Sequence, residues 1–221
     1  MGDINQKNFI QAHKSLIEGP ILEVGGKDYG STQKVRDFFS SKDKYVSADM
    51  EAGPGVDVVV DFTHSFEVVE RALPVKRFRT IINFSVLEHC RNPFEMCQNL
   101  SELLEPGGLI FISAPFAWHI HAFPSDYWRF TPDGIKALFP ALDFDLIPGN
   151  ISMQEGQLLP LEKLNFYLNF NGLREEIRKK RLSRLSAVLI FVCMKLHIMP
   201  EVFRHKMLFP SSMVNMVGKK R

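Results

Sequence analysis

The feature that most limits what this chain can fold into is an apolar strand that runs into a glycine-rich turn. Residues 21–24 read Ile-Leu-Glu-Val, and the glycines that follow are Gly25, Gly26 and Gly30. A second apolar run, 44–48, ends immediately before Asp49. Glycines let a backbone turn sharply and approach a ligand closely, and an acid at the end of the next strand can accept hydrogen bonds from ribose hydroxyls. The pattern therefore predicts a nucleotide pocket.

Apolar runs and helical patterns alternate along the first 150 residues. The predicted strands are 21–24, 44–48, 56–60, 79–84, 109–113 and 143–147, and the predicted helices are 4–18, 31–39, 64–73, 92–104 and 131–139. In the helix that Pro93 opens, Phe94, Met96 and Leu100 are expected to face the sheet. This alternation predicts an α/β fold with a doubly wound, mostly parallel sheet, whose ligands bind beyond the carboxyl ends of the strands.

The glycine turn departs from the dinucleotide fingerprint at one position. Lys27 stands where Gly-x-Gly-x-x-Gly requires its second glycine. A lysine side chain at that position would obstruct the close approach of a pyrophosphate, which argues against a nicotinamide dinucleotide. The turn alone does not say which other nucleotide binds.

Two segments further along the chain narrow the choice. Asn83-Phe-Ser-Val-Leu-Glu-His89 ends one predicted strand, and Leu103-Leu-Glu-Pro-Gly-Gly-Leu-Ile110 leads into the next. With the glycine turn and Asp49, their order and spacing resemble the class I S-adenosylmethionine-dependent methyltransferases, in the broad type 11-like group with a Leu-Glu-His signature. The resemblance covers roughly residues 18–140. It implies a Rossmann-like, seven-stranded sheet and S-adenosylmethionine as cofactor, although Lys27 departs from the usual Glu-x-Gly-x-Gly motif.

The resemblance also implies which residues bind the cofactor. Glu23 and the glycine turn would flank the methionine part, and Asp49, with Met50 beside it, would bind the ribose hydroxyls. Asp61 and Phe62 would lie beside the adenine, and Asn83 and Ser85 would line the floor of the cofactor pocket. From the residues themselves other interpretations stay open, because Glu23 could cap a neighbouring backbone and Asp61 could begin a helical turn. Glu88 and His89 are expected mainly to join a strand to its helix.

The segment 114–132 is unusually aromatic and rich in functional side chains. Its candidates for catalysis are His121, Asp126, Tyr127 and Arg129. His121 is suited to act as a base near neutral pH, and the other three would position an acceptor. Alternatively, Asp126 and Arg129 form a local ion pair and the aromatic residues a packed lid. No metal is predicted, because His119-x-His121 lacks a third ligand at a suitable spacing.

These residues predict methyl transfer to an O or N atom of a small-molecule or glycan-like acceptor. Methyl transfer is an in-line displacement, so the protein mainly aligns the reactants and excludes water. One alternative is a binding or assembly module that kept the fold and lost the chemistry, which Lys27 could indicate. A nicotinamide-dependent oxidoreductase is less favoured, because the glycine spacing fails and no Tyr-x-x-x-Lys pair follows the fourth strand.

The C-terminal part differs in charge from the rest. Residues 1–171 carry 15 Lys and Arg against 22 Asp and Glu, whereas residues 172–221 carry 12 against 3. We expect residues 1–150 to form the S-adenosylmethionine-binding core and residues 151–221 a lid and a basic, apolar helical extension. That extension could pack on the core or a second subunit, giving a homodimer, or residues 174–209 could contact a membrane surface.

Other partners and locations are less favoured by the composition. The apolar run 185–199 is shorter than the about 20 residues of a spanning helix. Nucleic acid is not a predicted partner, because the basic residues alternate with apolar runs. The N-terminus lacks the architecture of a secretion signal, and Cys90, Cys97 and Cys193 are an odd set without metal-like pairing. Reduced thiols of this kind predict a cytoplasmic protein.

Overall fold

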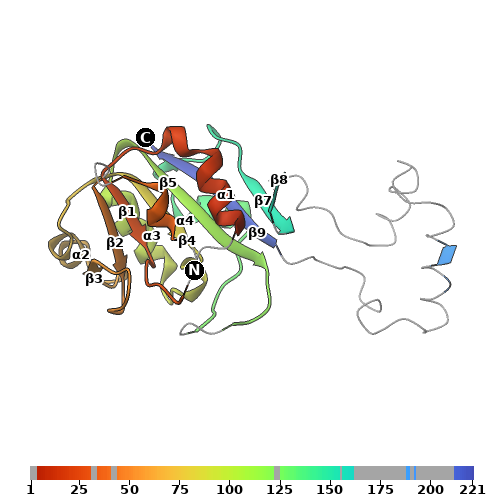
Figure 1. Cartoon of the computed structure of the whole chain (residues 1–221), viewed down its shortest axis with the longest axis horizontal. Helices are drawn as coiled ribbons and strands as arrows, with labels where there is room; N and C mark the ends of the chain where they lie inside the picture. Colours follow the sequence, from red (N-terminus) through yellow and green to blue (C-terminus); the bar gives the residue numbers. More distant parts are fainter. Residues whose placement is uncertain are drawn as a thin grey trace. The chain divides into compact units, whose positions relative to one another are not determined.

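The computed structural model of the chain describes residues 4–30, 34–40, 44–121, 125–154, 156–161, 188–189, 192 and 212–221 (Figure 1). The chain divides into two compact units, one of residues 1–161 with 211–221 and one of residues 162–210. Nearly all described residues belong to the first unit, which contains the sheet. Of residues 162–211 only 188–189 and 192 are described, so the helical extension stays a prediction.

The described residues form one sheet of nine strands, with the order β3-β2-β1-β4-β5-β9-β7-β8 and with β6 paired to β9. Five strands are parallel to one another: β1 (Ile21–Val24), β2 (Tyr45–Asp49), β3 (Val58–Val59), β4 (Phe78–Phe84) and β5 (Leu104–Ala117). The antiparallel strands are β6 (Leu142–Asp143), β7 (Asn150–Gln154), β8 (Gln157–Pro160) and β9 (Ser212–Lys220). The predicted α/β fold with a mostly parallel central sheet is confirmed, with more strands than the seven expected.

The last strand was not predicted from the sequence. β9 inserts between β5 and β7, and its residues Ser212–Gly218 are all buried (Figure 1). Because both of its faces are covered, the run lacks the alternation of a half-exposed strand and was assigned to the C-terminal extension. Residues 157–160, expected in the lid and helical extension, form β8. The sheet is therefore completed by residues from the far end of the chain.

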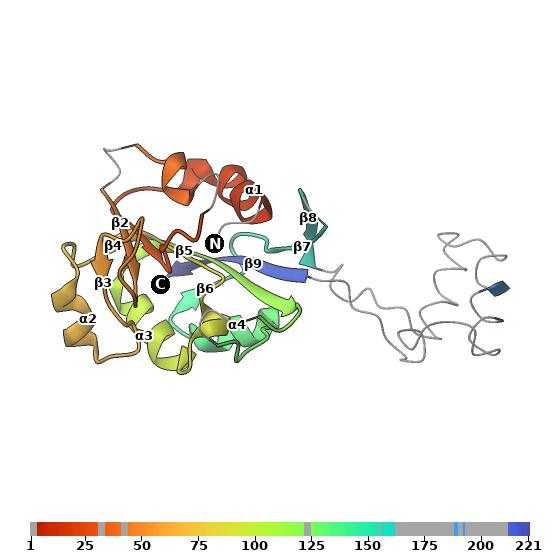
Figure 2. The same cartoon turned by 60° about the horizontal axis from the view of Figure 1, so that its bottom comes forward.

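The helices lie on both sides of the sheet. Figure 2 shows α1 (Ile4–Ala12) on one side and α3 (Pro93–Leu103) and α4 (Pro132–Leu138) on the other. α2 (Phe66–Ala72) follows β3, and short 3-10 turns are η1 (Lys14–Leu16), η2 (Val35–Phe38) and η4 (Leu87–His89). α3 and α4 start as predicted, since proline takes the first turn of each and the Asn92 and Thr131 side chains accept from backbone amides.

The core holds α1 against the sheet. Phe9 and Ile10 of α1 pack on a cluster that includes Ile21, Ile82 and Phe111, and the ring centroids of Phe9 and Phe111 are 5.9 Å apart. All five side chains are at most 1% exposed. Burial on this scale, at about 25 cal/mol per Å² of apolar surface, holds the leading helix against β1, β4 and β5.

Several predicted elements are shorter than expected. The predicted helix 31–39 is described only as η2, after which Phe39 turns extended and stacks on Tyr45 with ring centroids 5.4 Å apart. The predicted strand 56–60 is reduced to β3, because the Asp57 carboxylate accepts from the Ser47 amide and takes the place of a backbone bond. The strand expected at 143–147 ends at Asp143, whose side chain accepts from the amide of Asp145 and closes a turn.

One core prediction is wrong. Phe94 was expected to face the sheet, but its side chain is 65% exposed. Met96, Cys97, Leu100 and Leu103 of α3 are buried, and Phe94 precedes Met96 by two positions. Residues two apart on a helix point to nearly opposite sides, so the phase set by the buried residues turns Phe94 outward. Within the described residues, no helix combines the length and the apolar character needed to cross a membrane.

Candidate active site

A cavity of about 760 Å³ lies beyond the carboxyl ends of the parallel strands. Its volume falls within the range of about 300–1,000 Å³ that is usual for small-molecule sites. Most lining residues come from the β1 turn, the end of β2, the loop after β3, η4 with its flanks and the segment that follows β5. The lining residues are Val24, Gly25, Tyr29, Asp49, Met50, Glu51, Val60, Asp61, Phe62, Thr63, Ser85, Val86, Glu88, His89, Cys90, Arg91, Met96, Pro115, Trp118, His119, His121, Tyr127 and Met213.

The glycine turn is held tightly at its start. The amides of Gly25 and Gly26 both donate to the carbonyl of Ala48, over 2.8 and 3.2 Å. Gly25 has a φ of +76°, and a Cβ there would lie 2.3 Å from a methyl carbon of Val86; a Cβ on Gly26 would lie 1.8 Å from Ser47 Oγ. Both positions therefore require glycine. Gly25 lines the cavity, whereas Gly26 and Gly30 support the turn from outside it.

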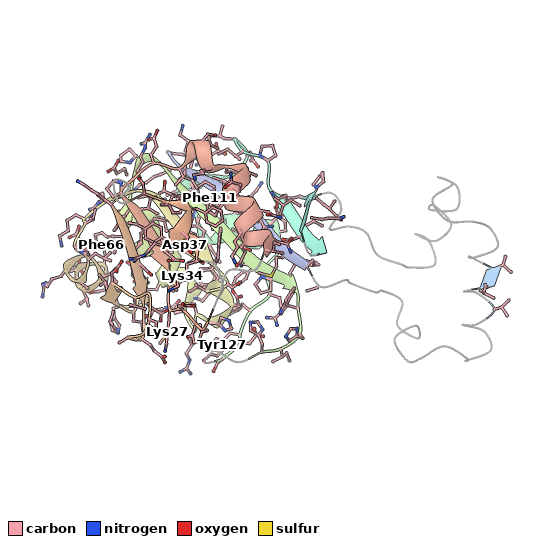
Figure 3. The ribbon with its side chains drawn as sticks, viewed as in Figure 1. Lys27, Lys34, Asp37, Phe66, Phe111 and Tyr127 are labelled. Carbon is pink, nitrogen blue, oxygen red and sulfur yellow. The ribbon has the colours of Figure 1, made fainter. Side chains whose placement is uncertain are left out.

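Lys27 does not obstruct the cavity. Its ammonium group lies 2.6 Å from the Glu51 carboxylate and 5.4 Å from the centre of the Tyr29 ring, and its side chain is not part of the cavity wall. In Figure 3, Lys27 and Tyr127 both lie at the lower edge of the view. Among the described residues other than glycine, only Lys44 and Ser85 have a positive φ, so Lys27 adopts an ordinary backbone conformation. The departure from the family motif is therefore accommodated without closing the pocket.

Asp49 lies at the end of β2 with its carboxylate on the cavity wall. Its Oδ2 accepts from the amide of Lys27 over 3.2 Å, and its Oδ1 accepts from the amide of Glu51 over 3.0 Å. These bonds tie the carboxylate to the glycine turn and orient it. Each carboxylate oxygen can accept more than one hydrogen bond, so both keep capacity for a ligand hydroxyl. Met50 follows on the same wall.

The loop after β3 combines both roles that the sequence left open for Asp61. Its Oδ1 accepts from the amide and the hydroxyl of Thr63, over 2.8 and 2.7 Å, so it does shape a turn. Asp61 and Phe62 nevertheless both line the cavity. The loop is held by Asn99 of α3, whose amide donates to the carbonyls of Phe62 and His64 over 2.8 and 2.7 Å. Nothing in the sequence pattern indicated that Asn99 has this function.

Besides Gly26 and Gly30, two predicted cofactor residues do not line the cavity. Glu23 is half-buried in β1, where loss of solvent raises the pKa of its carboxyl, an effect that the nearby hydroxyls of Tyr45 and Ser47 partly oppose. Asn83 is fully buried in β4, with its amide nitrogen 4.0 Å from the sulfur of Met96. Ser85, in contrast, lines the cavity with a φ of +53°, and its hydroxyl accepts from Gln6 over 2.7 Å.

The Leu-Glu-His segment forms η4 and places two functional side chains in the cavity wall. Glu88 is 1% exposed, and its Oε2 has no hydrogen-bond partner among the described residues. Burial raises the pKa of this carboxyl to about 7. Nδ1 of His89 lies 2.7 Å from the Ser125 carbonyl, and the His89 and His121 ring centroids are 4.8 Å apart. These residues were expected mainly to connect a strand to a helix, and the structure places both of them on the cavity wall.

Asp126 and Arg129 form the ion pair that was the alternative interpretation of this segment. Two guanidinium nitrogens of Arg129 donate to the two oxygens of Asp126, whose side chain is 2% exposed. This pairing holds the pKa of Asp126 well below its usual range. Arg129 also donates to the carbonyls of Trp118 and His119. The pair therefore holds the segment in place rather than lining the cavity.

Tyr127 and His121 are the two predicted catalytic residues that line the cavity. The Tyr127 amide donates to the Glu88 carbonyl over 2.7 Å, which joins the two segments, and its side chain is 48% exposed. The amide of His121 donates to Asp126 Oδ2 over 3.0 Å, and its ring Nδ1 lies 3.1 Å from the same oxygen. Trp118, which the sequence analysis did not single out, stands on the same wall.

Solved structures of methyltransferases share this architecture. A SAM-dependent methyltransferase from Archaeoglobus fulgidus matches with a TM-score of 0.52 and 15% identity, over 97% of this chain and 92% of that one. The N-methyltransferase NodS from Bradyrhizobium japonicum matches with a TM-score of 0.52 and 9% identity, over 98% and 96%. The CurJ carbon methyltransferase also gives 0.52, with 12% identity, over 98% of this chain and 53% of that one. The chain therefore has the fold of the class I S-adenosylmethionine-dependent methyltransferases.

Comparisons of the amino-acid sequence add no family assignment to this fold. No protein-family model matches this chain, and no curated protein matches it.

Proposed function

We propose that this protein transfers a methyl group from S-adenosylmethionine to an O or N atom of a small-molecule or glycan-like acceptor. The observation that carries the proposal is the position of the Asp49 carboxylate. It ends β2 on the wall of a cavity at the carboxyl ends of parallel strands, within a methyltransferase fold. Ligands of open α/β sheets bind at this edge, and an acid at this strand end suits a ribose diol.

The residues of the β1, β2 and β3 loops fit the cofactor. Asp49 would accept from the ribose hydroxyls, Asp61 and Phe62 would lie beside the adenine, and Gly25 would let the backbone approach the ligand closely. S-Adenosylmethionine supplies a methyl group on a positively charged sulfur. Glu23, Gly26, Gly30 and Asn83 lie outside the cavity wall and would act on the cofactor by shaping the strand ends.

The η4 and post-β5 segments would receive the acceptor. Trp118 and Tyr127 are partly exposed on the cavity wall and offer flat surfaces for a planar or sugar ring. Glu88, His89 and His121 are the groups that could take a proton from an acceptor hydroxyl or amine, and Asp126 and Arg129 would hold His121 in place. The solved relatives include enzymes named as N- and carbon methyltransferases, so the acceptor atom is a proposal from this cluster.

Calorimetric titration of the full chain with S-adenosylhomocysteine, S-adenosylmethionine and NAD tests the proposal. We expect the two adenosyl ligands to bind and NAD not to bind. Asp49→Ala should weaken S-adenosylhomocysteine about 10- to 100-fold, since each hydrogen bond to a charged group is worth about 1.5–3 kcal/mol. The matched control is Asp145→Ala, because Asp145 pairs with Lys136 on the surface and is no part of the cavity wall.

Each other outcome has a definite meaning. A folded protein that binds no adenosyl ligand would favour the binding or assembly module. Tight binding of NAD would favour the oxidoreductase. Equal affinities of the Asp49→Ala variant and the parent would remove Asp49 from the site.

Two further predictions remain open. Residues 174–209, proposed to contact a membrane surface or a second subunit, lie outside the described residues apart from 188–189 and 192. The cytoplasmic location stays a prediction from the cysteines. Liposome sedimentation of the full chain against a variant without residues 174–209 tests the membrane contact, and equal partitioning would contradict it.

A further inference from the structure

Three metal-binding side chains converge on one point of the cavity. Glu88, His89 and His121 each offer a donor atom, and these atoms all lie within 4.8 Å of one another. Glu88 and His89 come from η4, and His121 comes from the segment after β5. The sequence predicted no metal because His119-x-His121 lacked a third ligand. In the structure, His121 lies instead beside two possible ligands from the Leu-Glu-His segment, Glu88 and His89.

The Glu88 carboxyl is buried on the cavity wall. It is 1% exposed, and its Oε2 has no hydrogen-bond partner among the described residues, although it faces the cavity. The nearby cation, Arg129, is directed to Asp126 with both of its terminal nitrogens. Burial disfavours the charged form of a carboxyl, and a cation coordinated beside it would stabilise that form.

His89 is oriented as a metal ligand. Its Nδ1 lies 2.7 Å from the Ser125 carbonyl oxygen. A carbonyl can only accept a hydrogen bond, so Nδ1 carries the proton and Nε2 keeps its lone pair. Histidines that bind metals characteristically donate their other ring N–H to a carbonyl or carboxylate, which fixes the ring and its tautomer.

His121 has the equivalent arrangement with a carboxylate. Its Nδ1 lies 3.1 Å from Asp126 Oδ2 and 3.2 Å from the His119 carbonyl, both of which accept. Arg129 keeps Asp126 ionised through paired hydrogen bonds. Nδ1 of His121 therefore donates, and Nε2 is the nitrogen left for a ligand. Asp126 and Arg129 act as positioning residues for His121.

We propose that Glu88, His89 and His121 bind a divalent transition-metal ion through one carboxylate oxygen and the two Nε2 atoms. Two imidazoles and one carboxylate suit Zn²⁺, Mn²⁺, Fe²⁺ or Co²⁺ better than the all-oxygen preference of Ca²⁺ or Mg²⁺. Ligands about 2.1 Å from a tetrahedral ion lie about 3.4 Å apart, so side-chain rotation has to shorten donor separations of up to 4.8 Å by up to about 1.4 Å. Three protein ligands leave a coordination position open, which is typical of catalytic rather than structural ions.

The open position gives the ion a function in methyl transfer, and this part rests on the proposed function. A hydroxyl oxygen of the acceptor bound there would have a lowered pKa and would release its proton to solvent. The oxygen would then form the new bond to the methyl carbon while the carbon–sulfur bond breaks and its electron pair stays on sulfur, giving neutral S-adenosylhomocysteine. The acceptor class would be a hydroxyl compound, and His121 would be a ligand instead of the base.

Metal binding can be measured without knowing the acceptor. Full-length protein without a histidine tag is stripped with EDTA, dialysed, and titrated with Zn²⁺ by calorimetry and with Co²⁺ by visible absorption. We expect one ion per chain and absorption bands typical of Co²⁺ bound in a low-symmetry site. Glu88→Gln and His121→Ala should each weaken Zn²⁺ at least 100-fold, and Asp126→Asn should weaken it about 10- to 100-fold through His121.

The matched control is His119→Ala. His119 also lines the cavity, two positions from His121, but is no member of the cluster. Its replacement should leave Zn²⁺ affinity unchanged. Absence of stoichiometric Zn²⁺ and Co²⁺ binding, or an equal loss in the His119 and His121 variants, would overturn the metal site. Circular dichroism of each variant shows whether a loss of binding reflects loss of the fold.

The same samples separate the two proposals. S-Adenosylhomocysteine bound by the metal-free protein together with a failure to bind Zn²⁺ refutes the metal site and leaves the methyltransferase proposal standing. Stoichiometric Zn²⁺ without adenosyl binding refutes the methyltransferase proposal and leaves the metal site standing.

Discussion

The two halves of the cavity are built in different ways. We call residues 24–29, 49–51 and 60–63 the cofactor half, after the ligand proposed for it. It consists of strand ends and turns held by backbone amides, as when the Lys27 amide donates to Asp49. We call residues 85–91 and the described residues of 115–127 the acceptor half, which is held by side chains that bond to distant backbone carbonyls, such as His89 to Ser125 and Trp128 to Cys90. The shape of the cofactor half therefore depends on backbone geometry, and the shape of the acceptor half depends on side-chain contacts between distant parts of the chain.

This difference has a consequence for how each half tolerates change. Substitutions of the turn glycines in the cofactor half act through backbone strain and should disturb folding and cofactor binding together. Substitutions in the acceptor half should disturb its own geometry and leave the cofactor half intact. The predictions below test that separation, beginning with the largest expected effect.

Gly25→Ala should be the most disruptive change in the cofactor half. Gly25 has a φ of +76°, and the new Cβ would lie 2.3 Å from a Val86 methyl carbon. The left-handed backbone costs about 1–2 kcal/mol and overpacking a further 1–3 kcal/mol, so we expect the free energy of unfolding to fall by about 2–5 kcal/mol. Urea denaturation measures it.

The control is Gly30→Ala in the same turn. Gly30 has a φ of +94°, but a Cβ there meets no atom within 4 Å. Only the backbone cost applies, about 1–2 kcal/mol. Equal losses of stability in the two variants would mean that the close approach of the new Cβ of Gly25→Ala to Val86 costs nothing.

Asp126→Asn should have the largest stability effect among the acceptor-half predictions. It removes the charge that pairs with Arg129 and orients His121, in a side chain that is 2% exposed. Hydrogen bonds to charged groups are worth about 1.5–3 kcal/mol, so we expect a stability loss of about 1–3 kcal/mol. Affinity for S-adenosylhomocysteine should change less than about twofold, or about 0.4 kcal/mol.

Asp145→Asn gives the matched surface control. Asp145 pairs with Lys136 at 2.6 Å but is 81% exposed, and exposed pairs contribute about 0–1 kcal/mol. Thermal denaturation of both variants makes the comparison. A tenfold loss of S-adenosylhomocysteine affinity in Asp126→Asn would show that the halves are coupled.

Glu23→Gln should show a pH-dependent effect in the strand that supports the cofactor half. Burial raises the pKa of the Glu23 carboxyl, so the folded state binds its proton more tightly than the unfolded state. Stability therefore declines as pH rises above the ordinary value of 4.5. We expect the variant to be more stable than the parent at pH 8, with a difference that shrinks towards pH 4.5.

Denaturation midpoints between pH 4.5 and 8 test this, with Glu18→Gln as the control. Glu18 is an exposed acid that pairs with Arg79. A Glu23→Gln difference that is constant across this range would contradict the argument from burial.

Lys27→Ala should have the smallest effect on binding. The Lys27 side chain pairs with Glu51 outside the cavity wall, and its amide, which bonds to Asp49, is retained in the variant. We expect the affinity for S-adenosylhomocysteine to change less than about twofold, since an exposed ion pair is worth about 0–1 kcal/mol. A change above tenfold by calorimetry would show that the side chain contacts the ligand.

The parallel half of the fold was predictable because its signals are local. β1, β2 and β4 were found from apolar runs, and α3 and α4 from proline and their capping residues. The position of Asp49 followed from the same reasoning. Errors arose where a side chain replaced a backbone bond, as Asp57 does beside β3, or where both faces of a strand are covered, as in β9.

The candidate site was predictable to the same extent. Eight of the predicted residues line the cavity, namely Gly25, Asp49, Met50, Asp61, Phe62, Ser85, His121 and Tyr127. Glu88 and His89 were expected mainly to join a strand to its helix, and their place on the cavity wall depends on which segment packs against η4. Sequence spacing does not report that Ser125 and Tyr127 bond to this turn.

The sequence by itself therefore determined the α/β fold, the glycine turn and the acid at the end of β2, since strand periodicity, glycine conformation and helix capping act over a few residues. Only the tertiary structure decided that Lys27 turns away to Glu51, that β9 completes the sheet, and that Glu88, His89 and His121 meet. These are contacts between residues far apart in the chain, and packing of the whole sheet brings them together.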